Sequence, residues 1–263
     1  GERYLIPVGE ELGASEVCLV EPWACVEGSY LKQLRRSIRT GGRLALVVDA
    51  GRAIMGLAES MTKGGTPADV SVISEDPTAL ECIQGMGLNV LQALSCDRLP
   101  DNTYDDIIYY GSAGGTIEIL GEKLAPGGII NVVLGGNIIG DKIGVGIGRV
   151  HYQSTCWIGT VGEDASDSYR MIPACVEIRN DDRILVIGAG GPMGQMHMIR
   201  NICSGLQGLK LVGTDLSDER LESLKQKTEK LAADHNVGLE LINNRDESLT
   251  GTFSYIAIMV PRS

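Results

Sequence analysis

Short apolar runs alternate with longer stretches of mixed apolar and polar residues from Leu44 to the end of the chain. An uninterrupted apolar run of about five residues is typical of a strand buried on both faces of a sheet. The longer stretches between the runs have the apolar spacing of amphipathic helices. This alternation predicts an α/β protein whose parallel strands are joined by crossover helices.

The predicted elements fall into two series. In the first series, strands are expected at 44–48, 69–73, 89–91, 106–110, 129–134 and 156–160, and helices at 53–63, 77–84, 115–124 and 167–178. In the second series, strands are expected at 184–187, 210–214, 239–242 and 254–260, and helices at 193–204 and 218–233. The Gly- and Ile-rich segment 135–148 predicts a tight connection or an edge hairpin.

Each series predicts a Rossmann-like, doubly wound parallel sheet, so the chain is expected to carry two such domains in tandem. We place a lead-in segment with a connecting helix at 1–39, the first domain with its return segment at 40–178, and the second domain at 179–263. The basic residues Lys32, Arg35, Arg36 and Arg39 are expected on the solvated face and last turn of the connecting helix. The second domain is expected to be truncated, since a doubly wound fold normally continues beyond a fourth strand.

A glycine-rich turn between a strand and a helix is the most informative motif. Its candidate coenzyme-binding residues are Gly188, Ala189, Gly190, Gly191, Pro192, Met193 and Gly194. Small residues there permit a tight turn, close approach of a pyrophosphate and close packing of the helix on the strand. Asp215 ends the next strand, where a carboxylate accepts from ribose hydroxyls and repels a 2'-phosphate, which favours NAD over NADP. The alternative is a glycine turn that binds no coenzyme and only lets the helix pack on the strand.

A weaker copy of this layout begins earlier, with Gly51 and Gly56 in the turn and Glu75 at the end of the next strand. Here Ala53 stands at the close-approach position, where its methyl group would crowd a pyrophosphate, and Asp49 places a negative charge nearby. Two interpretations stay open: a second working coenzyme site, or a structural repeat that has lost its ligand.

Composition excludes several classes of protein. The 263 residues carry a formal net charge of -11, which argues against a nucleic-acid surface. Seven scattered cysteines without a Cys-x-x-Cys pair argue against a disulfide framework or a zinc ribbon, and we interpret all of them as structural. No secretory signal and no apolar run of membrane length is found, so a cytoplasmic protein without membrane contact is expected. Three dispersed histidines, His151, His197 and His235, suggest no catalytic group.

Several separate segments resemble the zinc-type, medium-chain alcohol and polyol dehydrogenases. They are Ile6-Pro7, Leu19-Val-Glu-Pro-Trp-Ala-Cys-Val26, Tyr104–Ser112, Leu124–Gly128, Val150–Thr160, Gly191–His197 and Thr214–Leu221. The last two are similar to sorbose-1-phosphate reductase-like members. In that family, the zinc ligands belong largely to an N-terminal domain with a Cys and a Gly-His-Glu motif, which this sequence lacks. The resemblance therefore implies the coenzyme-binding part only, with Glu21 near zinc in a longer protein.

These observations predict the NAD(H)-binding portion of an oxidoreductase of the zinc-dependent alcohol, polyol or sugar-phosphate dehydrogenase type. The resemblance implies a small polyol, sugar or sugar phosphate as substrate of the full protein, with zinc only in that longer protein. We expect a homo-oligomer, and a fragment that is inactive alone. The competing hypothesis is a non-catalytic nucleotide-binding or dimerisation module built from duplicated Rossmann units.

Overall fold

The computed structural model describes residues 9–62, 65–246 and 248–260, which form two compact units. Leu34–Ala174 make up one unit, called here the inserted unit. The chain up to Gln33 and the chain from Cys175 onward together make up the other, called the host unit. The inserted unit thus interrupts the host unit in sequence. Residues 1–8, which include the Ile6-Pro7 segment of the resemblance, and residues 261–263 lie outside the described residues.

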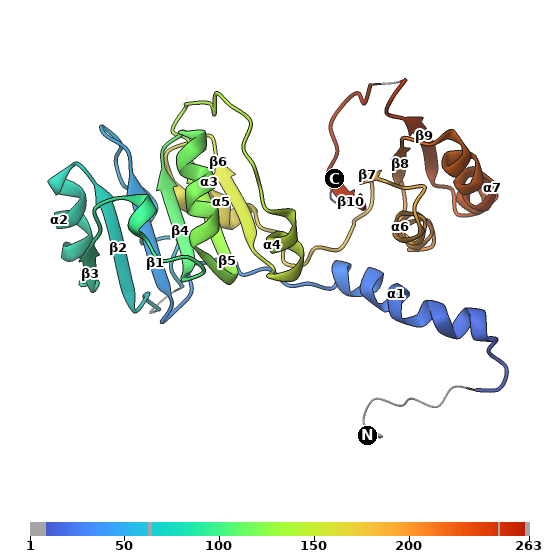
Figure 1. Cartoon of the computed structure of the whole chain (residues 1–263), viewed down its shortest axis with the longest axis horizontal. Coiled ribbons are helices and arrows are strands. Elements are labelled where there is room, and N and C mark those ends of the chain that lie inside the picture. The colour runs from blue at the N-terminus through green and yellow to red at the C-terminus, as the bar shows by residue number, and fades with distance from the viewer. Residues whose placement is uncertain (1–8, 63–64, 247, 261–263) are drawn as a thin grey trace. The chain divides into compact units, whose positions relative to one another are not determined.

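The inserted unit contains a six-stranded parallel sheet (Figure 1). Its strands are β1 (Arg43–Val48), β2 (Asp69–Ser74), β3 (Val90–Gln92), β4 (Tyr104–Tyr110), β5 (Leu124–Val133) and β6 (Cys156–Thr160). Its helices are α2 (Pro77–Gly85), η2 (Cys96–Arg98), α3 (Gly114–Lys123), α4 (Ile147–Tyr152) and α5 (Ala165–Met171). The strand order β3-β2-β1-β4-β5-β6 is that of a complete Rossmann sheet, and it reverses between β1 and β4.

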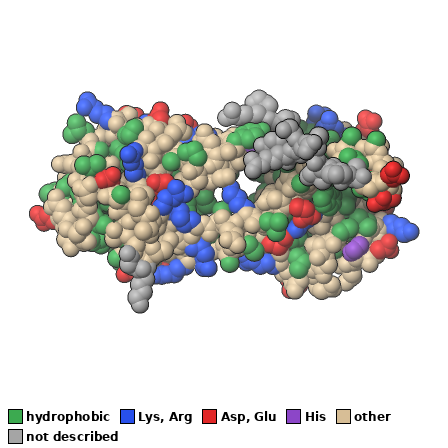
Figure 2. Space-filling model, turned by 90° about the horizontal axis from the view of Figure 1, so that it is seen from below, with side chains coloured by type: hydrophobic (Ala, Val, Ile, Leu, Met, Phe, Trp, Pro, Cys, Tyr) green, Lys and Arg blue, Asp and Glu red, His purple; other side chains and the backbone are tan. Residues whose placement is uncertain are grey.

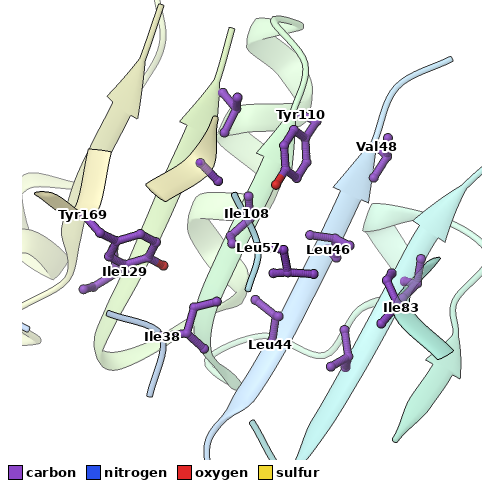
Figure 3. Close-up of a cluster of buried hydrophobic side chains, with 14 of the residues drawn as sticks. Ile38, Leu44, Leu46, Val48, Leu57, Ile83, Ile108, Tyr110, Ile129 and Tyr169 are labelled. Atoms are coloured by element: carbon purple, nitrogen blue, oxygen red, sulfur yellow. The ribbon is translucent and has the colours of Figure 1, made fainter. Parts of the chain in front are cut away.

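Alternate residues of β1 enter two different hydrophobic cores, as the pleat of a strand requires. Leu44 and Leu46 face the core that contains Tyr169 of α5 and Ile83 of α2 (Figure 3). Ala45 lies in the core on the other face, beneath α3. Both faces of β1 are therefore buried, which explains its uninterrupted apolar sequence.

The crossover from β1 to β2 differs from the expectation. The helix expected at 53–63 is absent from residues 53–62, which form turns and bends, and residue 63 lies outside the described part. Gly56 has a φ of +74°, which interrupts a right-handed helix, and a Cβ there would collide with the Asp164 carboxylate. Met55 instead forms a β-bridge with Asp164, and the buried Leu57 lies in the core over β1 (Figure 3).

The host unit contains a four-stranded parallel sheet in the order β10-β7-β8-β9. Its elements are α1 (Ala14–Tyr30), β7 (Arg183–Ile187), α6 (Pro192–Ile202), β8 (Lys210–Asp215), α7 (Asp218–Asp234), β9 (Gly238–Asn243) and β10 (Tyr255–Ile258). The strand order reverses between β7 and β10. Val26 and Tyr30 anchor α1 in the core that α6 and α7 form with this sheet. The predicted α/β class with two Rossmann-like parallel sheets is confirmed.

The basic segment after α1 is not helical, contrary to the expectation. The helix ends at Tyr30, and the chain then runs without helical structure to β1. Arg35 donates to both carboxylate oxygens of Asp106 at 2.8 and 2.9 Å, and Arg39 forms an ion pair with Asp105. Since Asp106 is only 1% exposed, an uncompensated carboxylate there would be costly, and Arg35 supplies the neutralising charge.

Two further boundaries differ from the sequence expectation. The helix expected at 167–178 is the shorter α5, which ends at Met171 two residues before Pro173, since the residue before a proline disfavours helical backbone. The segment 135–148 forms an irregular connection that leads into α4, with positive φ at Gly135 and Gly136.

The side of the molecule shown in Figure 2 carries acidic side chains interspersed with Lys and Arg. Among the described residues, no helix combines the length and the apolar character needed to cross a membrane.

Candidate dinucleotide-binding site

The turn after β7 is fixed by hydrogen bonds to the neighbouring strand. The amides of Gly188 and Ala189 both donate to the carbonyl oxygen of Thr214, each at 2.8 Å. Gly188 has a φ of +79°, and a Cβ at this position would lie 2.8 Å from the carbonyl oxygen of Met259. Glycine is therefore required here by both the backbone conformation and the close approach of the chain after β10.

The first turn of α6 presents unpaired amides. Gly191 is the N-cap and Pro192, which has no amide hydrogen, is the first helical residue. Within the described part of the chain, the amides of Met193 and Gly194 have no hydrogen-bond acceptor. A Cβ on Gly194 would collide with the carbonyl oxygen of Gly188, so glycine lets this helix end pack against the turn. Two free donors and the positive end of the helix dipole thus meet beside the turn.

Asp215 ties the glycine turn to the end of β8. One carboxylate oxygen accepts from the amide of Gly190 at 3.1 Å, and the other accepts from the amides of Leu216 and Ser217 at 2.8 and 3.1 Å. The side chain is half-buried at the carboxyl end of the sheet. Because each carboxylate oxygen carries two lone pairs, Asp215 retains capacity to accept from a ligand hydroxyl.

A pocket of about 560 Å³ opens at the carboxyl ends of the host strands. It is lined by Ile187, Gly188, Gly191, Pro192, Met193, Thr214, Asp215, Leu216, Arg220, Asn244, Met259 and Val260. This is the side of an open parallel sheet that binds ligands, at the reversal of strand order between β7 and β10. The volume lies within the range of small-molecule and cofactor sites.

The structure therefore brings most of the residues predicted from the second glycine turn to one pocket. Gly190 and Gly194 are not among the lining residues, but they allow the turn to pack closely beside the pocket. A Cβ on Gly190 would lie 2.6 Å from the Cβ of Arg220, which does line it. The residues that sequence reasoning missed, such as Asn244 and Met259, follow strands far along the chain. Only the strand order could have revealed them.

The first glycine turn has a different local structure. Gly51 and Gly56 both have a φ of +74°, and no helix lies between them and β2 among the described residues. Arg52 lies between them and donates to the carbonyl oxygens of Leu134 at 2.6 Å and Val133 at 3.2 Å. Its guanidinium is thus used to cap the end of β5. Glu75 lines a second pocket at the ends of β1 to β3, and neither glycine is among the residues that line it.

A partly buried cluster of polar side chains joins α6 to α1. Arg200 binds both carboxylate oxygens of Glu177 at 2.6 Å, contacts Glu27 of α1 at 3.2 Å, and lies over the Tyr30 ring at 4.0 Å. The Tyr30 hydroxyl is 2.8 Å from Nδ1 of His197, which is 3% exposed. Burial, with a smaller effect of Arg200, lowers the pKa of His197 to about 4. His197 is therefore a packed neutral side chain that joins α1 to α6.

The described residues contain no group of three His, Cys, Asp or Glu side chains that could hold a metal ion. Glu21 is exposed on α1, where the Cys25 thiol lies 3.4 Å from its carboxylate. The seven cysteines form no disulfide, and five of them are exposed, so their expected role as packed hydrophobic side chains holds for few of them. The exposed His151 packs against the neighbouring Tyr152 and lies outside both pockets.

No protein-family model matches the chain. Among curated proteins, it is 25% identical to the uncharacterized protein YggP of Escherichia coli (strain K12), over 74% of this chain and 52% of that protein. It is 23% identical to mannitol-1-phosphate 5-dehydrogenase of Aliivibrio fischeri, over 75% of this chain and 54% of that protein. The chain spans about half the length of these curated relatives.

Among solved structures, 2R,3R-butanediol dehydrogenase from Bacillus subtilis matches 69% of this chain and 53% of its own, with 12% identity and a TM-score of 0.35. L-idonate 5-dehydrogenase from Escherichia coli matches 76% of this chain and 56% of its own, with 10% identity and a TM-score of 0.34.

Proposed function

We propose that the host unit is the NAD(H)-binding part of an oxidoreductase of the zinc-dependent alcohol, polyol or sugar-phosphate dehydrogenase type. The observation that carries this proposal is the pocket at the glycine turn, where a helix with free amides faces a carboxylate at the end of the next strand. The similarity to mannitol-1-phosphate 5-dehydrogenase favours a polyol phosphate or sugar phosphate as the substrate of the whole protein.

Each part of the coenzyme has a matching group in this pocket. The amides of Met193 and Gly194 would donate to the pyrophosphate, and the helix dipole would favour its negative charge. Asp215 would accept from the adenosine ribose hydroxyls. Bound NAD supplies the hydride acceptor, and this chain's residues bind and orient it.

Zinc belongs, in this proposal, to a part of the longer protein that supplies its ligands. The resemblance places the zinc ligands of such dehydrogenases largely in an N-terminal domain, and this chain spans about half the length of its curated relatives. The chain by itself should bind the coenzyme without turning over an alcohol.

Isothermal titration calorimetry of the chain with NAD and NADP tests this proposal. Wild type should bind NAD more tightly than NADP, because Asp215 repels a 2'-phosphate. Asp215→Asn should weaken NAD binding about tenfold, the value of one charge-assisted hydrogen bond. Asp234→Asn, at the exposed far end of α7, is the matched control and should bind as wild type does. No binding of NAD to wild type, or equal binding by Asp215→Asn, would refute the assignment.

A second measurement distinguishes the proposed enzyme from the competing hypothesis of a non-catalytic module. The full-length protein with zinc should reduce NAD in the presence of a polyol or polyol phosphate. Tight NAD binding without activity on any such substrate would favour the module.

A further inference from the structure

The inserted unit has its own pocket, of about 410 Å³, at the carboxyl ends of its first three strands. It is lined by residues 47–50, 73–75 and 93–97 together with Thr116 and Ile119 of α3. Open parallel sheets bind their ligands on this side, next to the reversal of strand order, which here lies between β1 and β4. Both the volume and the location are those of a ligand site.

The charges of this pocket are all negative. Asp49, Glu75 and Asp97 line it, and no Lys or Arg is among its lining residues. Arg52, three residues after Asp49, is committed to the carbonyl oxygens at the end of β5, and the exposed Arg98, which directly follows Asp97, is not among the lining residues. The described part of the β1–β2 crossover also provides no helix N-terminus. A pyrophosphate in this pocket would therefore meet three carboxylates and no lysine or arginine among the lining residues.

The position of Asp49 is fixed by buried groups. The hydroxyl of Tyr109, a fully buried side chain, donates to its carboxylate at 2.7 Å and accepts from the amide of Ala113 at 3.1 Å. Burial and Asp49 raise the pKa of Tyr109 to about 12, so the phenol remains a donor. A Cβ on Gly111 would collide with the Asp49 carboxylate, and this glycine leaves room for it. The carboxylate is thus held in place at the end of β1.

The other two carboxylates are available to a ligand. Glu75 and Asp97 are exposed, and no described residue donates a hydrogen bond to either side chain. Glu75 directly follows β2, the position from which an acid accepts ribose hydroxyls in nucleotide-binding parallel folds. Apolar side chains line the same pocket, among them Ile73, Ile119 and Leu94, which is 77% exposed. An apolar surface beside a ribose acceptor suits a nucleobase.

We propose that this pocket of the inserted unit binds a nucleoside that carries a positive charge in place of phosphates, such as a sulfonium nucleoside. Glu75 accepts from the ribose hydroxyls, the apolar side chains contact the base, and Asp49 and Asp97 neutralise the positive charge. This site is separate from the coenzyme pocket of the host unit and does not depend on the function proposed for it.

The test is a titration of the whole chain, with its isoleucine methyl groups labelled for NMR. Ile73 and Ile119 line the proposed site, whereas Ile187 lines the host pocket. The probes share one adenosine scaffold and differ in charge: S-adenosylmethionine, adenosine, AMP and NAD. S-adenosylmethionine and adenosine should both shift the Ile73 and Ile119 signals. The affinity obtained from these shifts should be highest for S-adenosylmethionine and lower for adenosine. AMP should bind there at least about tenfold more weakly than adenosine, because its phosphate meets the carboxylates.

Matched variants assign the effect to the pocket. Glu75→Gln should weaken S-adenosylmethionine binding about tenfold, since a charge-assisted hydrogen bond is lost. Glu81→Gln, an exposed substitution on α2 outside the pocket, should leave it unchanged. The proposal is overturned if S-adenosylmethionine leaves Ile73 and Ile119 unshifted, or if AMP or NAD binds there as tightly as adenosine. Shifts at Ile187 concern only the host pocket.

Discussion

His197 makes the stability of the host unit depend on pH. Burial lowers its pKa from 6.5 to about 4, so the folded unit favours the neutral ring by about 3 kcal/mol. A lowered histidine pKa contributes stability above the unfolded value of 6.5, and this contribution is lost as pH falls toward 4. Between pH 7 and pH 5, the linkage relation gives a loss of about 2 kcal/mol in the free energy of unfolding.

The two tryptophans allow the units to be followed separately. Trp23 lies on α1 of the host unit and Trp157 on β6 of the inserted unit. In a Trp157→Phe background, urea unfolding monitored by fluorescence reports on the host unit alone, which matters because two units need not unfold in one step. The free energy of unfolding should fall by about 2 kcal/mol from pH 7 to pH 5.

The comparison between histidine variants decides the cause. His197→Gln removes the titrating ring, so this variant should be less stable at pH 7 and should lose about 2 kcal/mol less on acidification. His235→Gln, at the exposed C-cap of α7, should follow the wild-type profile. If His197→Gln and wild type lose equal stability between pH 7 and pH 5, His197 is not held neutral by burial and the reasoning is refuted.

Three substitutions test the remaining contacts. Gly194→Ala should abolish NAD binding measurable by calorimetry, because the added methyl group collides with the backbone of the turn and displaces it. Such overpacking costs about 1–3 kcal/mol of stability. Gly51→Ala, in the other glycine turn, should strain its positive φ by about 1–2 kcal/mol yet bind NAD as wild type does; weaker NAD binding would place coenzyme there. Arg35→Met should lower the free energy of unfolding of the inserted unit by about 3–5 kcal/mol, because Asp106 remains buried without its cation. Urea unfolding monitored by Trp157 fluorescence measures this loss. A smaller loss would mean that the other hydrogen-bond donors to Asp106 are enough to stabilise its carboxylate.

The strands and most helices could be predicted because their determinants are local. In β1 and β7, every residue of the apolar core segment packs on one face or the other, so the run is uninterrupted. In α7, Ser217 accepts from the amide of Arg220, a cap that the Ser-Asp-Glu-Arg sequence indicates. Periodicity and capping act over a few residues and can be read from one sequence.

The segment after α1 could not be predicted because its partners are distant. Arg35 reaches Asp106, which is 71 residues away in the sequence, and Tyr169 completes the buried group at 3.1 Å. A cluster of arginines with helical spacing looks like a solvated helix face until the carboxylate that it neutralises is known. The grouping of α1 with the C-terminal part of the chain also depends on distant residues. The core contacts of α1 are with residues that follow the inserted unit in the sequence.

The two glycine turns show how similar spacing can occur in different local structures. In the host unit, Pro192 at the first helical position has the backbone angle of a helix start, and α6 follows with free amides. In the inserted unit, the positive φ of Gly56 prevents a helix, and Asp164 from a distant segment occupies the space beside it. No described helix begins between β1 and β2, so this crossover places no helix N-terminus beside the carboxylates of Asp49 and Glu75. A sequence comparison limited to glycine spacing treats the two turns as copies, whereas the proline after Gly191 already distinguishes the turn that a helix follows directly.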